Sequence, residues 1–304
     1  MGSGAWTAKA FDTYICSTKA MSAADYSVSN LSAQENFVNR SLDRVLDPRN
    51  VMRECRDSDE HPNTIPVILA LDVTGSMGPA AMAVAKKLNE IMTTLYSTIK
   101  DVEFCIMGIG DLAYDRAPIQ ISQFESDVRI AEQLDKIYFE RGGGGNGYES
   151  YTAAWYMGLY HTKLDCWNRG RKGIIITLGD EALNPYLPDI CEVVGGTEEG
   201  VTDTEKLYEL AREKFDIYHI AVDDGKTSYY WYKDKIDNSW GKLLKQNLIV
   251  SNLDNLPKTI TDIIKNYEDD MIAFPNNGII YNETPLNLID NGSITTNENN
   301  EVTW

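Results

Sequence analysis

Residues 64–78 read TIPVILALDVTGSMG, and this stretch decides the fold. Its unbroken apolar run from Ile65 to Leu71 predicts a strand buried on both faces, as is typical of the centre of a parallel sheet. The run gives way abruptly to Asp72, Thr74 and Ser76. Because ligands bind beyond the carboxyl ends of strands in open parallel sheets, these polar side chains form a candidate binding loop.

Alternating helix and strand patterns follow this strand. Apolar residues recur at helical spacing from Met77 to Ile99, which predicts a helix. Further strands are expected at Val102–Ile109, Ala117–Phe124, Gly173–Leu178, Ile217–Val222 and Leu248–Val250, and further helices at Asp127–Ile137, Ser150–Leu164, Thr204–Phe215 and Lys258–Tyr267. Pro118 suits an edge strand. The sequence therefore predicts an α/β fold with a Rossmann-like, doubly wound, mostly parallel sheet, helices on both faces and one antiparallel edge strand.

The character of the chain changes at two points. Residues 1–64 are polar and mixed, and they predict an extension that packs on the core, with short helices at Ala5–Cys16 and Ala33–Leu46. Residues 65–268 carry the repeating strand and helix pattern. Residues 269–304 are Asn-rich and weakly apolar, which predicts a C-terminal arm or tail.

The chain of 304 residues is strongly acidic, with 46 acidic against 28 basic residues and a formal charge of −18. This charge disfavours binding to nucleic acid or to an anionic membrane, and it favours a cation or a basic protein surface. The N-terminus lacks a basic start followed by an apolar stretch, and no apolar run reaches the length of about 18 residues that a membrane helix needs. We therefore expect a cytoplasmic protein.

The cysteines and histidines suggest no site of their own. The five cysteines are scattered and form no C-x-x-C pair, which argues against a disulfide framework or a zinc site. We expect them to be buried, reduced thiols. His219 lies in a strand-like run and is expected in the core, whereas His61 and His161 are expected at the surface.

The candidate loop has the chemistry of a divalent-metal site. A hard cation prefers oxygen ligands, and Mg²⁺ takes them at about 2.1 Å while keeping some waters. Asp72, Thr74 and Ser76 supply one carboxylate and two hydroxyls, and Asp180, which follows another apolar strand, supplies a second acid. The alternative is that the first three residues only cap the next helix.

Four motifs in order resemble a von Willebrand factor A domain with its metal-ion-dependent adhesion site. They are residues 64–78, MGIGD at 107–111, ERGGGGNGYESY at 140–151 and RKGIIITLGDEALNP at 171–185. The resemblance extends over the remaining pattern to about Tyr267. Residues 53–78 also resemble a group of stand-alone A-domain proteins from bacteria and their phages.

The resemblance implies particular metal ligands. The family's D-x-S-x-S motif and third-loop aspartate map onto Asp72, Thr74, Ser76 and Asp180. The second loop departs from the family, which usually presents a threonine after paired glycines. Here Asn146 follows four glycines, and Glu149 lies three residues further along the chain. Either side chain is a candidate ligand. Glu149 has an alternative role as a first-turn residue that favours the helix dipole.

The resemblance also implies a function. It indicates a non-enzymatic, metal-dependent protein-binding module in which a partner's Glu or Asp completes the coordination. Mg²⁺ is the expected metal, with Mn²⁺ or Ca²⁺ as alternatives. Relatives often work beside a MoxR-type ATPase, and a phage-encoded member is expected in the host cytoplasm or the virion.

Three other interpretations stay open. Asp72-Val-Thr-Gly-Ser also resembles the nucleophile loop of the haloacid-dehalogenase superfamily, with Asp180 in the magnesium motif and Lys172 as a charge clamp. Phosphatases of that superfamily place a second acid where Thr74 stands, which argues against it. Residues 142–147 fit G-x-G-x-x-G but follow no strand directly, so a dinucleotide site is disfavoured. The third interpretation is a structural component of a larger assembly.

Overall fold

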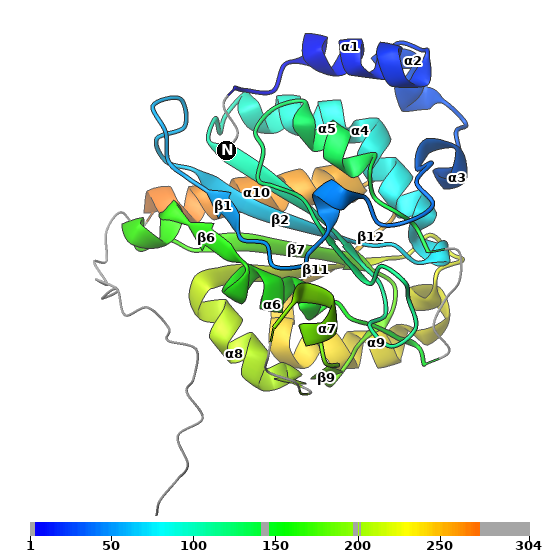
Figure 1. Ribbon diagram of the computed structural model, residues 1–304, viewed down its shortest axis with the longest axis vertical. Helices are drawn as coiled ribbons and strands as arrows, with labels where there is room; N and C mark the ends of the chain where they lie inside the picture. The colour runs from blue at the N-terminus through cyan, green and yellow to red at the C-terminus, as the bar shows by residue number, and fades with distance from the viewer. Residues whose placement is uncertain (1–3, 141–145, 197–199, 201, 274–304) are drawn as a thin grey trace, which may run out of the picture.

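A computed structural model describes residues 4–140, 146–196, 200 and 202–273. They form an α/β fold around a six-stranded sheet of order β12-β11-β7-β2-β3-β4 (Figure 1). Its strands are β2 (Ile65–Asp72), β3 (Val102–Ile109), β4 (Ile119–Ile121), β7 (Gly173–Gly179), β11 (Phe215–Val222) and β12 (Leu248–Ser251). All neighbours pair in parallel except β4, which pairs antiparallel with β3 at the edge. The predicted Rossmann-like α/β fold with one antiparallel edge strand is confirmed.

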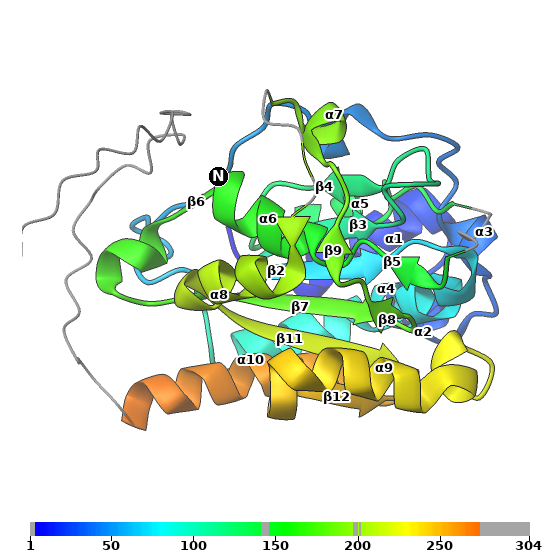
Figure 2. The ribbon, with the colours of Figure 1, turned by 90° about the horizontal axis from the view of Figure 1, so that it is seen from below.

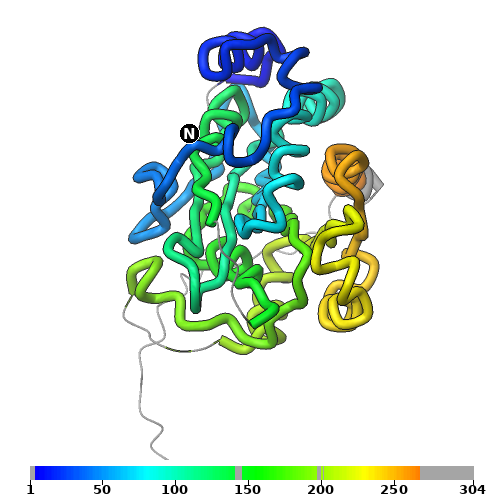
Figure 3. The backbone as a smooth tube through the Cα atoms, turned by 90° about the vertical axis from the view of Figure 1, so that its right-hand side faces the viewer, coloured from blue at the N-terminus to red at the C-terminus, as the bar shows by residue number. Residues whose placement is uncertain are grey.

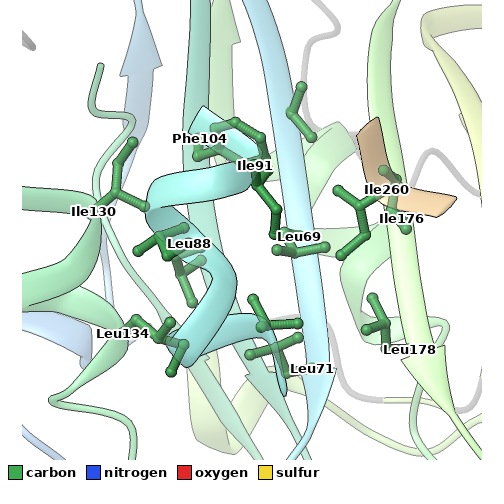
Figure 4. Packing of buried hydrophobic residues seen from close by; sticks show 14 of the residues in the cluster. Leu69, Leu71, Leu88, Ile91, Phe104, Ile130, Leu134, Ile176, Leu178 and Ile260 are labelled. Atoms are coloured by element: carbon green, nitrogen blue, oxygen red, sulfur yellow. The ribbon is translucent and has the colours of Figure 1, made fainter. Parts of the chain in front are cut away.

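Helices cover both faces of the sheet (Figures 1 and 2). One face carries α4 (Gly78–Tyr96), α5 (Arg129–Leu134) and α10 (Leu256–Ala273), and the other carries α6 (Ala153–Tyr160), α8 (Thr204–Lys214) and α9 (Ser228–Leu244). Alternate residues of β2 serve the two faces: Leu69 and Leu71 join the first cluster, whereas Ile68 and Ala70 join the second. Figure 4 shows Leu69 and Leu71 packed among side chains of the first cluster. Burial of each such leucine contributes about 1.5–3 kcal/mol.

The N-terminal segment covers the outer side of α4 (Figure 3). It contains α1 (Ala8–Lys19), α2 (Ala23–Val28) and α3 (Ala33–Asn36), followed by a 3₁₀ turn at Arg44–Leu46 and by β1 (Arg53–Cys55). A Cβ at Gly78 would lie 2.9 Å from Cβ of Ala33, so α3 fits closely against the start of α4. The helix that follows the candidate loop is therefore held between the sheet and this segment.

Three predicted helices are much shorter than expected. The helix expected at Asp127–Ile137 spans only Arg129–Leu134. The helix expected at Ala33–Leu46 ends at Asn36, because Phe37 leaves the helical conformation and packs its ring 4.5 Å from that of Phe139. The helix expected at Ser150–Leu164 starts only at Ala153 and ends at Tyr160.

Residues 162–164 instead form a strand, β6 (Thr162–Leu164), which pairs in parallel with β1. The partner of this strand is more than a hundred residues away, so no local pattern predicts it. The remaining short elements are β5 (Tyr148–Glu149), β8 (Ala182–Leu183), β9 (Tyr186–Leu187), α7 (Cys191–Val194) and β10 (Thr202–Asp203).

The aromatic run at residues 229–232 lies in a helix that the sequence analysis does not predict. It opens α9, which spans 17 residues and is kinked at Tyr232, where the backbone leaves the helical conformation. Tyr229, Ile236, Trp240 and Leu244 are its buried residues. Aromatic side chains supply half of this buried face, so the aliphatic spacing that marks an amphipathic helix is missing from the sequence.

Burial corrects two further expectations. His61 is buried, not exposed, and its ring nitrogens lie 2.9 Å from the Gly4 carbonyl oxygen and 3.3 Å from Asp101 Oδ1. All five cysteines are free thiols, and four are buried as expected, but Cys16 is exposed. Among the described residues, no helix is both long and apolar enough to cross a membrane. The predicted tail beyond Ala273 and the glycines at 142–145 lie outside the described residues.

Candidate metal centre

The first loop presents its oxygens at the carboxyl end of β2. Asp72 ends the strand, and its Oδ1 accepts hydrogen bonds from the backbone N–H of Thr74 at 2.8 Å and from the Thr74 hydroxyl. Neither Thr74, before the 3₁₀ turn Gly75–Met77, nor Met77, before α4, makes a side-chain capping hydrogen bond. The alternative that this loop serves only to cap the helix is therefore wrong.

The third loop meets the first because β7 pairs directly with β2. Thr74 Oγ1 lies 3.5 Å from Ser76 Oγ, and Ser76 Oγ lies 3.4 Å from Asp180 Oδ1. Neighbouring ligands of an octahedral cation with bonds of about 2.1–2.5 Å lie about 3.0–3.5 Å apart, so these three oxygens fit a divalent metal. Asp180 is fully buried whereas Ser76 is exposed, and the site therefore opens to solvent on the Ser76 side.

Tyr151 also belongs to the site, although no motif around it in the sequence marks it as a site residue. Its hydroxyl donates a 2.6 Å hydrogen bond to Asp72 Oδ2, and its ring is fully buried against His219 and Trp240, at centroid distances of 5.2 and 5.5 Å. A Cβ at Gly179 would lie 2.1 Å from that hydroxyl oxygen, so glycine is required there. A glycine at the end of an apolar strand was the one available signal of such a close approach.

Glu149 faces the first loop from β5. Its side chain is 6% exposed, and Oε2 has no hydrogen-bond partner among the described residues. Burial raises the pKa of Glu149, and the neighbouring carboxylates, Asp72 foremost, raise it further. The first turn of α6 begins at Ala153, so the role proposed for Glu149 in the helix dipole is wrong.

Asn146, the other second-loop candidate, is engaged elsewhere. Its Nδ2 donates to Asp111 Oδ2 at 2.7 Å, and its Oδ1 accepts from the Tyr148 N–H at 3.0 Å. Asp111 also accepts a hydrogen bond from the Ala113 N–H at 2.8 Å, and it thereby ties the loop after β3 to the second loop. Of the two candidates, Glu149 is therefore the one with a side-chain oxygen that has no hydrogen-bond partner among the described residues.

Electrostatics at the site favour a bound cation. Burial raises the pKa of Asp72, with a further contribution from Asp180, and burial also raises the pKa of Asp180. In the described part of the chain, the ion pairs include no Lys or Arg paired with Asp72, Asp180 or Glu149. Buried carboxylates without a cationic neighbour are costly, and a divalent ion would relieve that cost.

The donor set differs from a carboxylate or histidine cluster. Within the described residues, no three His, Cys, Asp or Glu side chains converge as metal ligands. The oxygens spaced for a cation here are two hydroxyls and one carboxylate, with Asp72 behind them. Three protein oxygens would fill only part of the coordination sphere of a divalent cation and would leave positions for water or a partner.

Lys172, the charge clamp of the phosphatase interpretation, does not lie at the site. It precedes β7 at the amino edge of the sheet and forms a 3.6 Å ion pair with Asp216. The seven residues of β7 place it about 20 Å from the carboxyl edge. That expectation is wrong.

Comparison with known proteins gives distant structural neighbours. No protein-family profile and no curated protein matches the chain. The pilus adhesin SpaC from Lactobacillus rhamnosus GG, in an open conformation, matches with a TM-score of 0.46 and 14% identity over 73% of this chain and 31% of the adhesin. A second structure of that adhesin matches with a TM-score of 0.48 and 12% identity over 73% and 32% of the two chains. This chain thus spans about a third of the adhesin, and the likeness carries no argument about the site.

Proposed function

We propose that this protein is a von Willebrand factor A-type module that binds another protein through a divalent metal. The observation that carries the proposal is the row of oxygens formed by Thr74 Oγ1, Ser76 Oγ and Asp180 Oδ1, spaced at 3.5 and 3.4 Å on an opening to solvent. When bound, the metal would supply a positive charge that attracts a carboxylate from the partner. Mg²⁺ is the metal that we favour, with Mn²⁺ and Ca²⁺ as alternatives.

The residues of the site have two proposed roles, as metal ligands and as residues that position those ligands. Thr74, Ser76 and Asp180 would contact the metal. Asp72 accepts the hydrogen of the Thr74 hydroxyl, which leaves the oxygen lone pairs of that hydroxyl for a cation. Glu149 adds negative charge from the second loop, and its Oε2, which has no partner in the described part of the chain, would be available to the metal or to a water bound to it.

The same hydrogen bonds disfavour an enzyme that uses Asp72 as a nucleophile. Oδ1 accepts from Thr74 and Oδ2 accepts from Tyr151 at 2.6 Å, so both oxygens are occupied. A carboxylate nucleophile needs an oxygen that is exposed to its substrate. Asp72 is only 1% exposed.

The partner and the compartment rest on the resemblance. We propose a protein partner that presents a Glu or Asp to the metal, and a MoxR-type ATPase is one such candidate. The corresponding location is the cytoplasm, or the host cytoplasm and virion for a phage-encoded protein.

Calorimetric titration with Mg²⁺, Mn²⁺ and Ca²⁺ tests the proposal. We expect binding to the wild type, loss of binding in Asp72→Ala, and unchanged binding in the control Asp216→Ala, whose carboxylate lies at the amino edge of the sheet. Mass spectrometry after incubation with acetyl phosphate is run in parallel. Phosphorylation of Asp72, or metal binding that Asp72→Ala leaves intact, would refute the proposed function.

A further inference from the structure

Three consecutive aromatic residues lie exposed at the start of α9. Tyr230, Trp231 and Tyr232 are 54%, 69% and 60% exposed, and we call them the aromatic turn. The rings of Tyr230 and Trp231 lie 5.0 Å apart at 90°, so they hold one another in a T-shaped pair. Tyrosine and tryptophan so exposed are enriched at protein interfaces, where they bury a large area at a low entropic cost.

The aromatic turn is fixed beside the proposed metal centre. The backbone N–H of Ser228 donates a 2.8 Å hydrogen bond to Asp180 Oδ2, which anchors the first turn of α9 to the third loop. Tyr229 is fully buried and fastens the same turn to the core. Since a helix rises about 1.5 Å per residue, the backbone of Trp231 lies about 5 Å along the axis from Ser228 and therefore within roughly 10 Å of Asp180 Oδ2.

Acidic side chains accompany the aromatic turn. Asp223 and Asp224 lie in the loop before α9, and Asp234 lies exposed after the turn. Two of the nearby lysines are engaged, because Lys233 forms a 3.5 Å ion pair with Asp237, and Nζ of Lys235 lies 4.4 Å from the centroid of the Tyr148 ring. Lys226 is the remaining basic residue of this segment. Residues 223–237 thus hold four aspartates against three lysines, so this segment carries a net charge of −1 within a chain whose charge is −18.

Arginine is the side chain that suits both features. Its guanidinium stacks on aromatic rings and also pairs with carboxylates, whereas an acidic side chain would be repelled and an aliphatic one would leave the carboxylates unpaired. The metal centre next to this surface requires a carboxylate from the partner. A partner that engages both must carry the two groups close together.

We propose that the aromatic turn binds an arginine side chain of the partner, and that this arginine lies in the same segment as the Asp or Glu that binds the metal. This inference rests on the proposed function and names the partner's chemistry. An extended chain advances about 3.3 Å per residue, so the span of roughly 10 Å corresponds to a separation of about three residues. The partner is thus a protein segment with an arginine about three residues from its metal-binding acid.

Short synthetic peptides test this pairing. Each capped, fluorescent Gly/Ser peptide carries one Asp and, three residues away, either Arg, Leu, Ala or Glu, and its binding to the Mg²⁺-loaded protein is measured by fluorescence polarisation. We expect the Arg peptide to bind about 5- to 10-fold more tightly than the Ala or Leu peptide, with the Glu peptide weakest.

Two variants assign the preference to the surface. Trp231→Ala should lower the affinity for the Arg peptide to that for the Ala peptide. It should leave the Mg²⁺ affinity within about twofold of wild type, because Trp231 is exposed and is not one of the proposed metal ligands. Tyr160→Ala, a tyrosine 43% exposed at the end of α6 on the amino edge, is the matched control and should change neither.

The outcomes separate this inference from the proposed function. Three outcomes overturn the inference alone, provided that calorimetry shows Mg²⁺ binding. They are equal affinity for the Arg and Ala peptides, tighter binding of the Leu or Glu peptide, and a preference for Arg that survives Trp231→Ala. Failure of every peptide to bind the Mg²⁺-loaded protein overturns it as well. Absence of binding to Mg²⁺, Mn²⁺ and Ca²⁺ alike overturns the proposed function. Arg-peptide binding that persists in EDTA overturns the link between the aromatic turn and the metal.

Discussion

Replacing Tyr151 with Phe removes one hydroxyl from beneath the proposed metal centre and preserves the shape of the side chain. That hydroxyl donates a 2.6 Å hydrogen bond to Asp72 Oδ2, and both residues are buried. The hydrogen bond stabilises the charged form of Asp72 and lowers its pKa, against the burial that raises it. Without the hydroxyl, the carboxylate holds a proton more strongly.

The expected loss of metal affinity follows from that hydrogen bond. A hydrogen bond to a charged group contributes about 1.5–3 kcal/mol, and 1.4 kcal/mol corresponds to a factor of ten in an equilibrium constant. Because metal binding needs the charged carboxylate, we expect Tyr151→Phe to weaken Mg²⁺ or Mn²⁺ binding about 10- to 100-fold near neutral pH. The deficit should shrink at higher pH, where the proton competes less.

Calorimetric titrations of wild type and Tyr151→Phe at about pH 7 and pH 9 measure both effects. Tyr267→Phe is the control, since Tyr267 is also buried but donates its 2.5 Å hydrogen bond to the Lys172 carbonyl oxygen at the other edge of the sheet. It should lose stability and keep its metal affinity. If Tyr151→Phe binds metal within about twofold of wild type at both pH values, Tyr151 does not position Asp72 and the reasoning is refuted.

Two further predictions concern stability in the absence of metal. Gly179→Ala would bring a Cβ to 2.1 Å from the Tyr151 hydroxyl, so we expect urea unfolding to show a free energy of unfolding lower by about 1–3 kcal/mol. A Cβ at Gly241 in α9 meets nothing within 4 Å, so the control Gly241→Ala should raise the free energy of unfolding by up to about 1 kcal/mol. Equal effects of the two substitutions would contradict this reasoning. Burial raises the pKa of Glu149 above its unfolded value, so between these two values the folded state binds more protons and the contribution of this group to stability falls as pH rises. The stability of Glu149→Gln relative to wild type in EDTA should therefore increase from about pH 5 to pH 8, and a constant difference would show that Glu149 lies in no such environment.

The long strands of the fold were predictable from the sequence because they are buried on both faces. Ile65–Asp72 and Gly173–Gly179 lie in the middle of the sheet, where unbroken apolar runs are required whatever the neighbours are. In contrast, Thr162–Leu164 forms a strand only because Arg53–Cys55 lies beside it. The start of α9 was missed for another reason, since Tyr230 to Tyr232 face solvent and give no amphipathic pattern.

The candidate site divides in the same way. Asp72, Thr74 and Ser76 were identifiable because they are local in sequence, and Asp180 because it ends a neighbouring apolar strand. Contacts made by residues from remote loops were not identifiable. Tyr151 reaches Asp72 across 79 positions, and Ser228 reaches Asp180 across 48. Side-chain direction after a turn decides such contacts, and the sequence alone does not specify it.

The hydrogen bonds of the two aspartates give them different roles in the proposed site. Both oxygens of Asp72 are already held, Oδ1 by Thr74 and Oδ2 by Tyr151, so this carboxylate orients the first loop and supplies charge from behind it. Asp180 has Oδ2 held by Ser228 but shares Oδ1 only with the Ser76 hydroxyl, at 3.4 Å. Asp180 Oδ1 is therefore the carboxylate oxygen that would contact a metal directly, whereas Asp72 would act on the metal through Thr74. Because Ser228 opens α9, a change at Asp180 on metal binding would also reach the aromatic turn, and the two halves of the proposed interface would respond together.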